Sequence, residues 1–215
     1  MYAELVILTK SSKNKGYCVA GIDINNGQWI RLTSDDKNTH GTLFPKDMQY
    51  ENESECQTLD VVRVQILGEN PSEYQPENVL INQDYYWKKT DEYTIDDVLK
   101  LHPPERHSYI FGNTLPYITE SEIGSIGYSL TLVAVEKLLI SKKINRYGKP
   151  KTKTDFLYGS NWYNEMSVTD PNFYGVPDGT RISKAALVIS IPDNPFQGDF
   201  SENRYYKFVA QIYEF

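Results

Sequence analysis

The sequence is poor in the residues that build disulfide frameworks and zinc sites. Among 215 residues there are two cysteines, Cys18 and Cys56, and three histidines. Two cysteines cannot form a disulfide framework, and no CxxC or Cys/His cluster favours zinc. We therefore expect two buried free thiols, with a single disulfide between them as the alternative.

The chain also lacks a long apolar run. No stretch approaches the roughly 20 apolar residues that a membrane span requires. The N-terminal segment is short and carries Glu4, so it does not have the pattern of a signal peptide. We expect a protein of the cytoplasm with no membrane association.

Familiar catalytic motifs are absent as well. The sequence holds no GxSxG, HExxH, P-loop or GxGxxG pattern. His102 and His107 flank Glu105 next to two prolines, where surface or hydrogen-bonded histidines are a better interpretation than metal ligands. The sequence thus predicts no catalytic residue, no metal and no cofactor, and it leans against an enzyme.

Tyrosine and alternating apolar residues are abundant. Seventeen tyrosines against eight phenylalanines favour strands, because a Tyr ring packs on a half-buried sheet while its hydroxyl reaches water. Apolar runs predict strands at residues 3–9, 17–24, 28–32 and 59–67, and Asn25-Asn26-Gly27 is typical of a hairpin turn. The fold class is therefore mostly β.

The pattern changes in the middle of the chain and then returns to strands. Thr94 and the acidic residues after it predict a short helix over 94–101. Further strands are predicted at 130–140, 155–158, 167–168, 185–191 and 205–213, with a basic loop over 142–153. We expect two tandem β-barrels, at 1–80 and 126–215, joined by a mixed connector with a short helix at 81–125.

Charge is segregated along the sequence. The formal net charge of −7 argues against bulk attraction to nucleic acid. One span nevertheless carries seven cations and no acidic residue: Lys137, Lys142, Lys143, Arg146, Lys149, Lys151 and Lys153. A smaller group consists of Lys10, Lys13 and Lys15, followed by Arg31. Three interpretations of the long span are open. It is a solvated hairpin whose charges prevent aggregation through exposed strand edges, a loop that binds a phosphate backbone, or a contact surface for a protein partner.

Aromatic residues accompany both basic groups. They are Tyr17 and Trp29 near the first, and Tyr147, Phe156, Tyr158, Trp162 and Tyr163 near the second. Rings beside lysines are suited to single strands, because bases offer π-faces and the backbone offers charge. Each single ring is nevertheless more often part of a core.

Two sets of short motifs point to a known family. The first is Thr9-Lys10-Ser11-Ser12-Lys13, then Gly16-Tyr17-Cys18-Val19-Ala20-Gly21-Ile22-Asp23 and Gly27-Gln28-Trp29-Ile30-Arg31. The second is Lys151-Thr152-Lys153-Thr154-Asp155-Phe156, then Ser167-Val168-Thr169-Asp170-Pro171. In these motifs the chain resembles the dual OB domain proteins of bacteria, over nearly its whole length. The resemblance implies two OB-like barrels and a nucleic-acid role, often near bacterial defence systems.

These features predict a non-catalytic module that binds single-stranded or structured DNA or RNA on a basic, aromatic face shared by two OB-like barrels. The expected phosphate contacts are Lys10, Lys13, Arg31, Lys149, Lys151 and Lys153, and the stacking candidates are Trp29, Tyr158 and Trp162. Ser11, Thr169 and Asp170 complete the predicted site.

Three alternatives remain open at this point. Thr169-Asp170-Pro171 is also a natural turn, in which Asp170 has a structural role instead of recognising a base edge or holding a metal. The second alternative is an enzyme or effector that acts on a nucleotide or RNA. It requires Lys10, Ser11, Arg31 and Asp170 to meet in one cleft. The third alternative is a protein-interaction module that uses the acidic middle segment.

Overall fold

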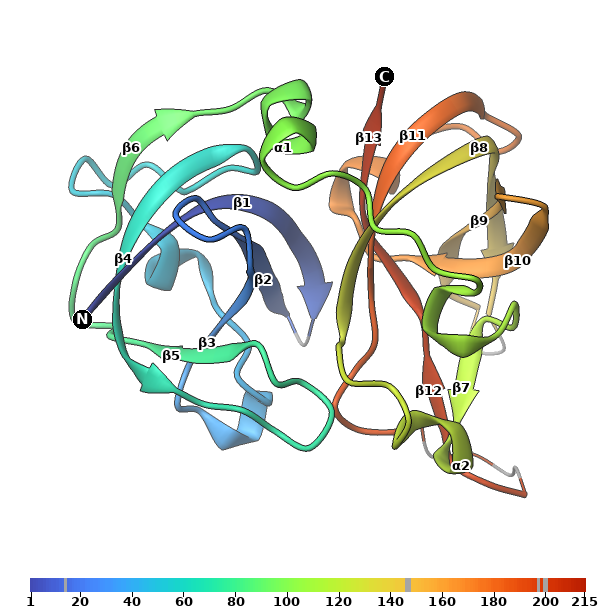
Figure 1. Cartoon of the computed structure of the whole chain (residues 1–215), viewed down its shortest axis with the longest axis horizontal. Coiled ribbons are helices and arrows are strands. Elements are labelled where there is room, and N and C mark those ends of the chain that lie inside the picture. The colour runs from blue at the N-terminus through green and yellow to red at the C-terminus, as the bar shows by residue number, and fades with distance from the viewer. Residues whose placement is uncertain (14, 146–147, 197, 199–200) are drawn as a thin grey trace. The chain divides into compact units, whose positions relative to one another are not determined.

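The computed structural model describes residues 1–13, 15–145, 148–196, 198 and 201–215 (Figure 1). The chain forms two compact units. Unit 1 contains Met1–Ser72 and Pro76–Pro103, and unit 2 contains Glu73–Gln75 and Pro104–Phe215. Residues 81–125, expected as a connector, supply elements to both units.

Unit 1 is built on six strands. They are β1 (Tyr2–Lys13), β2 (Gly16–Asp23), β3 (Trp29–Thr33), β4 (Asp60–Glu69), β5 (Asn78–Ile81) and β6 (Lys88–Glu92). The sheet order is β1-β2-β3-β5-β4-β6, and a further pairing of β1 with β4 closes the first five strands into a ring. All of these pairings are antiparallel except that of β3 with β5. A closed five-stranded sheet of this kind is the OB-like barrel.

Local sequence explains the turns and short helices of unit 1. The predicted hairpin after β2 is present: Gly27 has a φ of 72° and its N–H donates to the Asp23 carbonyl. The predicted helix is α1 (Ile95–Leu101), which begins after Thr94, whose side chain accepts from the Asp97 N–H. Two short 3-10 segments, η1 (Lys37–Thr39) and η2 (Pro45–Met48), lie between β3 and β4.

Unit 2 contains a closed barrel with the same strand connections. Its strands are β8 (Leu130–Ile144), β9 (Pro150–Tyr158), β10 (Asn161–Val168), β11 (Arg181–Ser190) and β13 (Phe208–Glu214), in the order β10-β13-β11-β8-β9. The pairing of β10 with β13 is parallel and the others are antiparallel, as in unit 1. The smaller elements are η3 (Ile110–Gly112), β7 (Tyr117–Thr119), α2 (Glu120–Ile123), η4 (Pro171–Phe173) and β12 (Arg204–Tyr206). The mostly β class and the two OB-like barrels are thus confirmed.

Each barrel has its own apolar core. In unit 1 the buried side chains include Leu5, Ile7 and Val62, and in unit 2 they include Phe156, Tyr163 and Leu187. Cys18 and Cys56 are both free thiols, as expected; Cys56 is buried as predicted, but Cys18 is only partly buried. Within the described ranges, no helix has the length and apolar character needed to cross a membrane.

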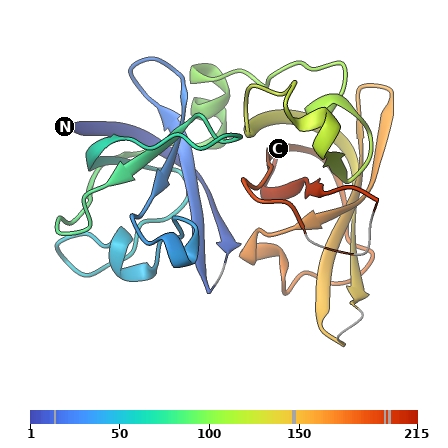
Figure 2. The same ribbon diagram turned by 90° about the horizontal axis from the view of Figure 1, so that it is seen from below.

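One prediction about the basic span is wrong. Residues 142–153 were expected as a loop, but β8 continues to Ile144 and β9 begins at Pro150. Lys143 pairs with Lys151 across the two strands, and Ile144 pairs with Pro150. Figure 2 shows the two strands, in yellow, side by side as one long hairpin. Cross-strand hydrogen bonds therefore hold much of this polar sequence in a strand conformation, despite its low apolar content.

Candidate nucleic-acid interface

The β8–β9 hairpin sorts its side chains onto two faces. Along β9, Thr152, Thr154 and Phe156 are buried, whereas Lys151 is exposed and Lys153 is partly exposed. Successive side chains of a strand point to opposite faces, so Lys151 and Lys153 lie on the outer face of the barrel. The strand geometry gives these two lysines a fixed spacing along the surface.

The cations of this hairpin differ in whether protein groups already bind them. Lys149 and Lys151 are exposed, and their ammonium groups have no hydrogen bond or ion pair with any residue that the structure describes. Lys143 forms an exposed ion pair with Glu165, at 3.3 Å between Nζ and Oε1. Arg146 and Tyr147, predicted to contribute to this region, lie outside the described residues. Lys149 and Lys151 are therefore the cations most available to an anionic ligand.

Lys153 is a partly buried cation that is held in place. Its Nζ donates to the Glu165 carbonyl at 3.0 Å and to the Ser167 hydroxyl at 2.8 Å. Burial lowers the pKa of Lys153, Glu165 opposes this, and the positive charges of Lys151 and Lys143 lower it further. The positive charges of Lys143, Lys151 and Lys153 therefore repel one another, and an anion bound among them would relieve this repulsion.

Lys142 is partly exposed, but protein oxygens already bind its ammonium group. Its Nζ donates to the Thr152 hydroxyl at 2.9 Å and to the carbonyls of Phe173 and Tyr174 at 2.7 and 3.0 Å. These carbonyls lie at the C-terminal end of η4, so Lys142 anchors that segment to the barrel. Its charge is used structurally.

The two predicted stacking rings of unit 2 have different environments. Trp162, at the start of β10, is 48% exposed and pairs with Leu157 of β9. Tyr158 packs against the core, and its hydroxyl accepts from the His107 N–H at 2.7 Å and donates to the Glu105 carbonyl at 3.3 Å. Trp162 therefore offers an open ring face, whereas Tyr158 is fixed by protein contacts.

Asp170 lies in the predicted turn, where its carboxylate is fully buried. It caps η4 by accepting from the Asn172 N–H at 3.0 Å, and its second oxygen accepts from the Ile212 N–H at 3.1 Å. Burial raises the pKa of Asp170 to about 6, although both N–H groups oppose the shift. Thr169 beside it pairs with the Val209 carbonyl through its N–H and its hydroxyl. This geometry favours the turn over contact with a base edge or metal.

Removal of the Asp170 carboxylate tests this structural role. Asp170→Ala leaves the buried Ile212 N–H without an acceptor, at a cost of about 1–3 kcal/mol, and removes the cap from the part-buried Asn172 N–H, while it relieves the cost of burying a carboxylate. We expect a net loss of about 2 kcal/mol in the free energy of unfolding, measured by urea denaturation, and a smaller loss for Asp170→Asn, which keeps one acceptor. An unchanged stability with lost oligonucleotide affinity would contradict the structural role.

A comparison with protein-family models decides the family. The model described as Dual OB-containing domain matches residues 3–212, nearly the whole chain. The chain belongs to this family. Comparison with curated proteins and with solved structures gives no match.

The OB-like connectivity indicates which strands of this dual OB chain to compare. In OB folds, oligonucleotides bind on the face of the second and third strands and on the loops that flank it. By strand order these are β9 and β10 in unit 2, with the β8–β9 hairpin as the first flanking loop. Lys149, Lys151, Lys153 and Trp162 all lie on these elements.

In unit 1 the predicted cations at the end of β1 already contact protein groups. Lys10 donates through Nζ to Glu55 Oε1 at 2.8 Å and to the Cys56 carbonyl. Lys13 donates to the His40 carbonyl at 2.8 Å. A phosphate would have to compete with these oxygens.

The other predicted residues of unit 1 are partly or fully buried. The Arg31 guanidinium donates to Glu77 Oε1 from Nε at 3.2 Å and from Nη2 at 3.0 Å, so its charge is paired inside the unit. Ser11 is buried in β1. Trp29 is half-buried, and its ring meets the edge of the His102 ring at 5.7 Å. Among the predicted phosphate contacts, those available to a ligand therefore lie in unit 2, on β9 and the β8–β9 hairpin.

Sequence reasoning missed a polar network around His107. Its Nε2 lies 3.2 Å from Glu105 Oε2 and 2.9 Å from the Thr131 hydroxyl, and its ring stacks on Tyr128. The Thr131 hydroxyl also donates to Glu105 at 2.9 Å. Glu105 and His107 are near in sequence, but Thr131 and Tyr128 meet them only through folding. In the described part of the chain, no three His, Cys, Asp or Glu side chains gather as a metal site requires.

Proposed function

We propose that unit 2 binds single-stranded nucleic acid on the outer face of β9 and β10 and on the β8–β9 hairpin. The observation that carries the proposal is that Lys149 and Lys151, unpaired within the described chain, lie just before and at the start of β9, while the exposed ring of Trp162 lies on the neighbouring strand β10. This is the face that OB folds use for oligonucleotides.

Local charge explains how an acidic protein would hold a polyanion. The net charge is −7, so affinity must come from the cations of one face and not from the molecule as a whole. Lys149 and Lys151 would each neutralise a phosphate, and Lys153 would contact a third with the ammonium N–H that Glu165 and Ser167 do not use. Counterions released from those phosphates supply the free energy of binding.

The ring of Trp162 favours single strands over duplexes. A base in a duplex is already stacked on its neighbours, whereas an unpaired base is free to stack on an exposed ring. Because Trp162 pairs with Leu157, six residues along β9 from Lys151, the ring and the cations would contact bases and phosphates of different nucleotides along one strand.

Fluorescence anisotropy with labelled single-stranded DNA and RNA tests the proposal. We expect a dissociation constant in the micromolar range or lower. The logarithm of the association constant should fall linearly with the logarithm of the salt concentration, with a slope of about 0.7 per phosphate contacted. A duplex of the same length should bind more weakly. Absence of binding at low salt would reject the proposal in favour of a protein partner.

Trp162 gives a second test on the same assay. Base stacking contributes about 1–3 kcal/mol per ring, so Trp162→Ala should lower affinity for a single strand about tenfold with little change in salt slope. Trp162→Phe should retain most of the affinity. Tyr85→Ala, which removes a 56% exposed ring from unit 1, is the matched control. Equal losses for Trp162→Ala and Tyr85→Ala would contradict a stacking role.

Arg31, Asp170 and Ser11 do not favour the enzyme alternative. Arg31 and Asp170 are buried and bound to protein groups, and Ser11 is buried as well. A cytoplasmic location and a place beside bacterial defence systems stay predictions.

A further inference from the structure

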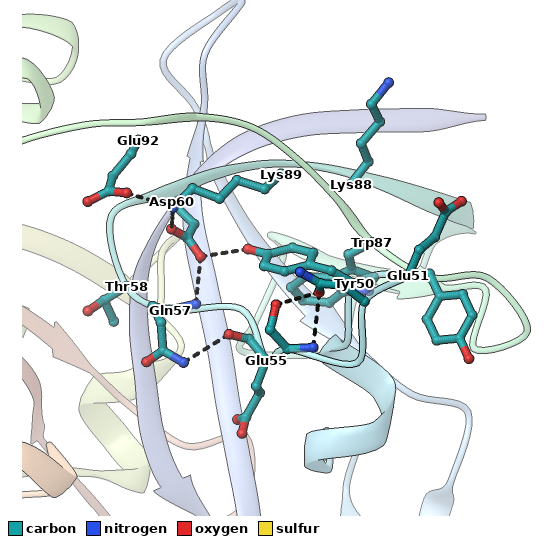
Figure 3. A pocket seen from close by; sticks show the side chains of 13 residues that line it. Tyr50, Glu51, Glu55, Gln57, Thr58, Asp60, Trp87, Lys88, Lys89 and Glu92 are labelled. Carbon is teal, nitrogen blue, oxygen red and sulfur yellow. Dashed lines mark hydrogen bonds and ion pairs between the residues drawn. The ribbon is translucent and has the colours of Figure 1, made fainter.

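We propose that a pocket in unit 1 binds an organic cation, an ammonium or guanidinium group on an alkyl chain. The pocket has a volume of about 840 Å³ and lies between the segment that precedes β4 and the segment around β6 (Figure 3). Volumes of about 300–1,000 Å³ are usual for small-molecule sites. The site is separate from the proposed nucleic-acid interface, so neither proposal depends on the other.

Aromatic rings form part of the wall. Tyr50, Tyr86 and Trp87 line the pocket. Tyr86 is 58% exposed and offers an open ring, whereas Trp87 is buried. The buried indole N–H of Trp87 has no hydrogen-bond partner among the residues that the structure describes; as a donor it would take an acceptor oxygen of a ligand and not its cationic group. Ring faces attract cations through their negative quadrupole.

Carboxylates outnumber cations around the pocket. Its charged lining residues are Glu51, Glu55, Asp60, Glu92, Lys88 and Lys89. In Figure 3 the carboxylates of Glu51, Glu55 and Glu92 lie on different sides of the Tyr50 ring. Glu51 is exposed and has no ion pair or hydrogen bond from its carboxylate within the described part of the chain. Lys10 pairs with Glu55, and Lys89 pairs with both Asp60 and Glu92, so Glu51 is the carboxylate of the lining that is available to a ligand.

A network of hydrogen bonds and ion pairs around the buried Asp60 orders one side of the pocket. Asp60 accepts from the Tyr50 hydroxyl at 2.6 Å, from the Gln57 N–H at 2.8 Å and from Lys89 at 2.5 Å. Burial acts to raise the pKa of Asp60, but the hydrogen bonds from Lys89, Tyr50 and Gln57 outweigh it and the pKa is lowered. Asp60 thus stays ionised at neutral pH and holds the Tyr50 ring in position.

The same network argues against an anionic ligand such as a nucleotide. Lys89 already bridges Asp60 and Glu92, at 2.5 and 2.7 Å. Of the two lysines in the lining, Lys88 has no hydrogen bond or ion pair within the described part of the chain, and a phosphate beside it would also face several carboxylates. A cation that binds Glu51 displaces no existing ion pair of the described lining.

Isothermal titration of the full chain at low ionic strength tests the proposal with three probes. Spermidine represents a free polyamine, N-acetyl-arginine amide represents a protein side chain, and AMP represents an anion of similar size. We expect saturable binding of at least one cation, and any binding of AMP should be unaffected by Tyr86→Ala. Binding of spermidine alone assigns the site to polyamines, and binding of the arginine probe alone assigns it to a protein partner. Binding of AMP that Tyr86→Ala weakens, or binding of neither cation, overturns the proposal.

Matched variants locate the binding. Tyr86→Ala and the double change Glu51→Gln with Glu92→Gln should each lower cation affinity about two- to fivefold per group removed. Tyr85→Ala and Glu53→Gln alter neighbouring exposed residues that do not line the pocket, and they should leave affinity unchanged. Equal affinity in the pocket and control variants overturns the proposal. Oligonucleotide binding, measured on the same proteins, should be the same in all of them.

Discussion

Replacing Lys149, Lys151 and Lys153 together by Glu is expected to lower the affinity for a single-stranded oligonucleotide roughly 100-fold at about 0.1 M salt. Each phosphate contact on a single strand contributes about 0.7 to the salt slope, and so about 0.7 in the logarithm of affinity between 1 M and 0.1 M salt. Three contacts therefore amount to about two orders of magnitude. The salt slope itself should fall by about 2, because three counterion-releasing contacts are lost.

A control variant with the same change in net charge distinguishes the effect of charge on the proposed binding face from the effect of total net charge. Lys46, Lys100 and Lys184 are exposed and lie outside β9, β10 and the β8–β9 hairpin. Changing these three to Glu should lower affinity far less and leave the salt slope nearly intact. An equal loss in both triple variants would show that net charge, and not this face, governs binding.

Gly21→Ala is expected to destabilise unit 1 by about 3–5 kcal/mol. A Cβ at this position would lie 2.0 Å from the Val6 carbonyl oxygen and 3.1 Å from the Ile7 Cα. Both are backbone atoms of β1, which pairs with β2 at Ile7 and Gly21, so no side-chain rotation relieves the clash. The two strands must separate and lose ladder hydrogen bonds. Urea unfolding followed by tryptophan fluorescence measures the loss, since Trp29 and Trp87 both belong to unit 1.

Gly68→Ala in β4 is the matched control. A Cβ at Gly68 meets nothing within 4 Å, and its backbone does not require glycine. We expect stability within about 1 kcal/mol of the parent, because Ala is at least as compatible with an extended strand. Comparable losses at both positions would place the effect of Gly21→Ala in the unfolded chain instead of the β1–β2 contact.

Several elements were predictable because their signals are local. Neighbouring residues alone specify the Asn25-Asn26-Gly27 turn and the strands on either side of it. The same holds for the helix that begins after Thr94. Alternation of apolar residues identified the strands, and the family motifs implied their arrangement as two OB-like barrels. The extension of β8 to Ile144 and of β9 back to Pro150 was missed because cross-strand hydrogen bonds hold these segments as strands, with few apolar residues to show it.

The sequence by itself determined the mostly β class, the two barrels and the position of the basic span. Only the tertiary structure decided which cations are available. Arg31 is paired with Glu77, which lies just before β5, and Lys142 binds carbonyls near η4. Lys149 and Lys151 have no such partner in the described chain. The pocket of unit 1 likewise joins residues around 50–60 with residues 86–92. Strand formation follows local periodicity, but the pairing or freedom of a charge depends on groups brought close from distant parts of the chain.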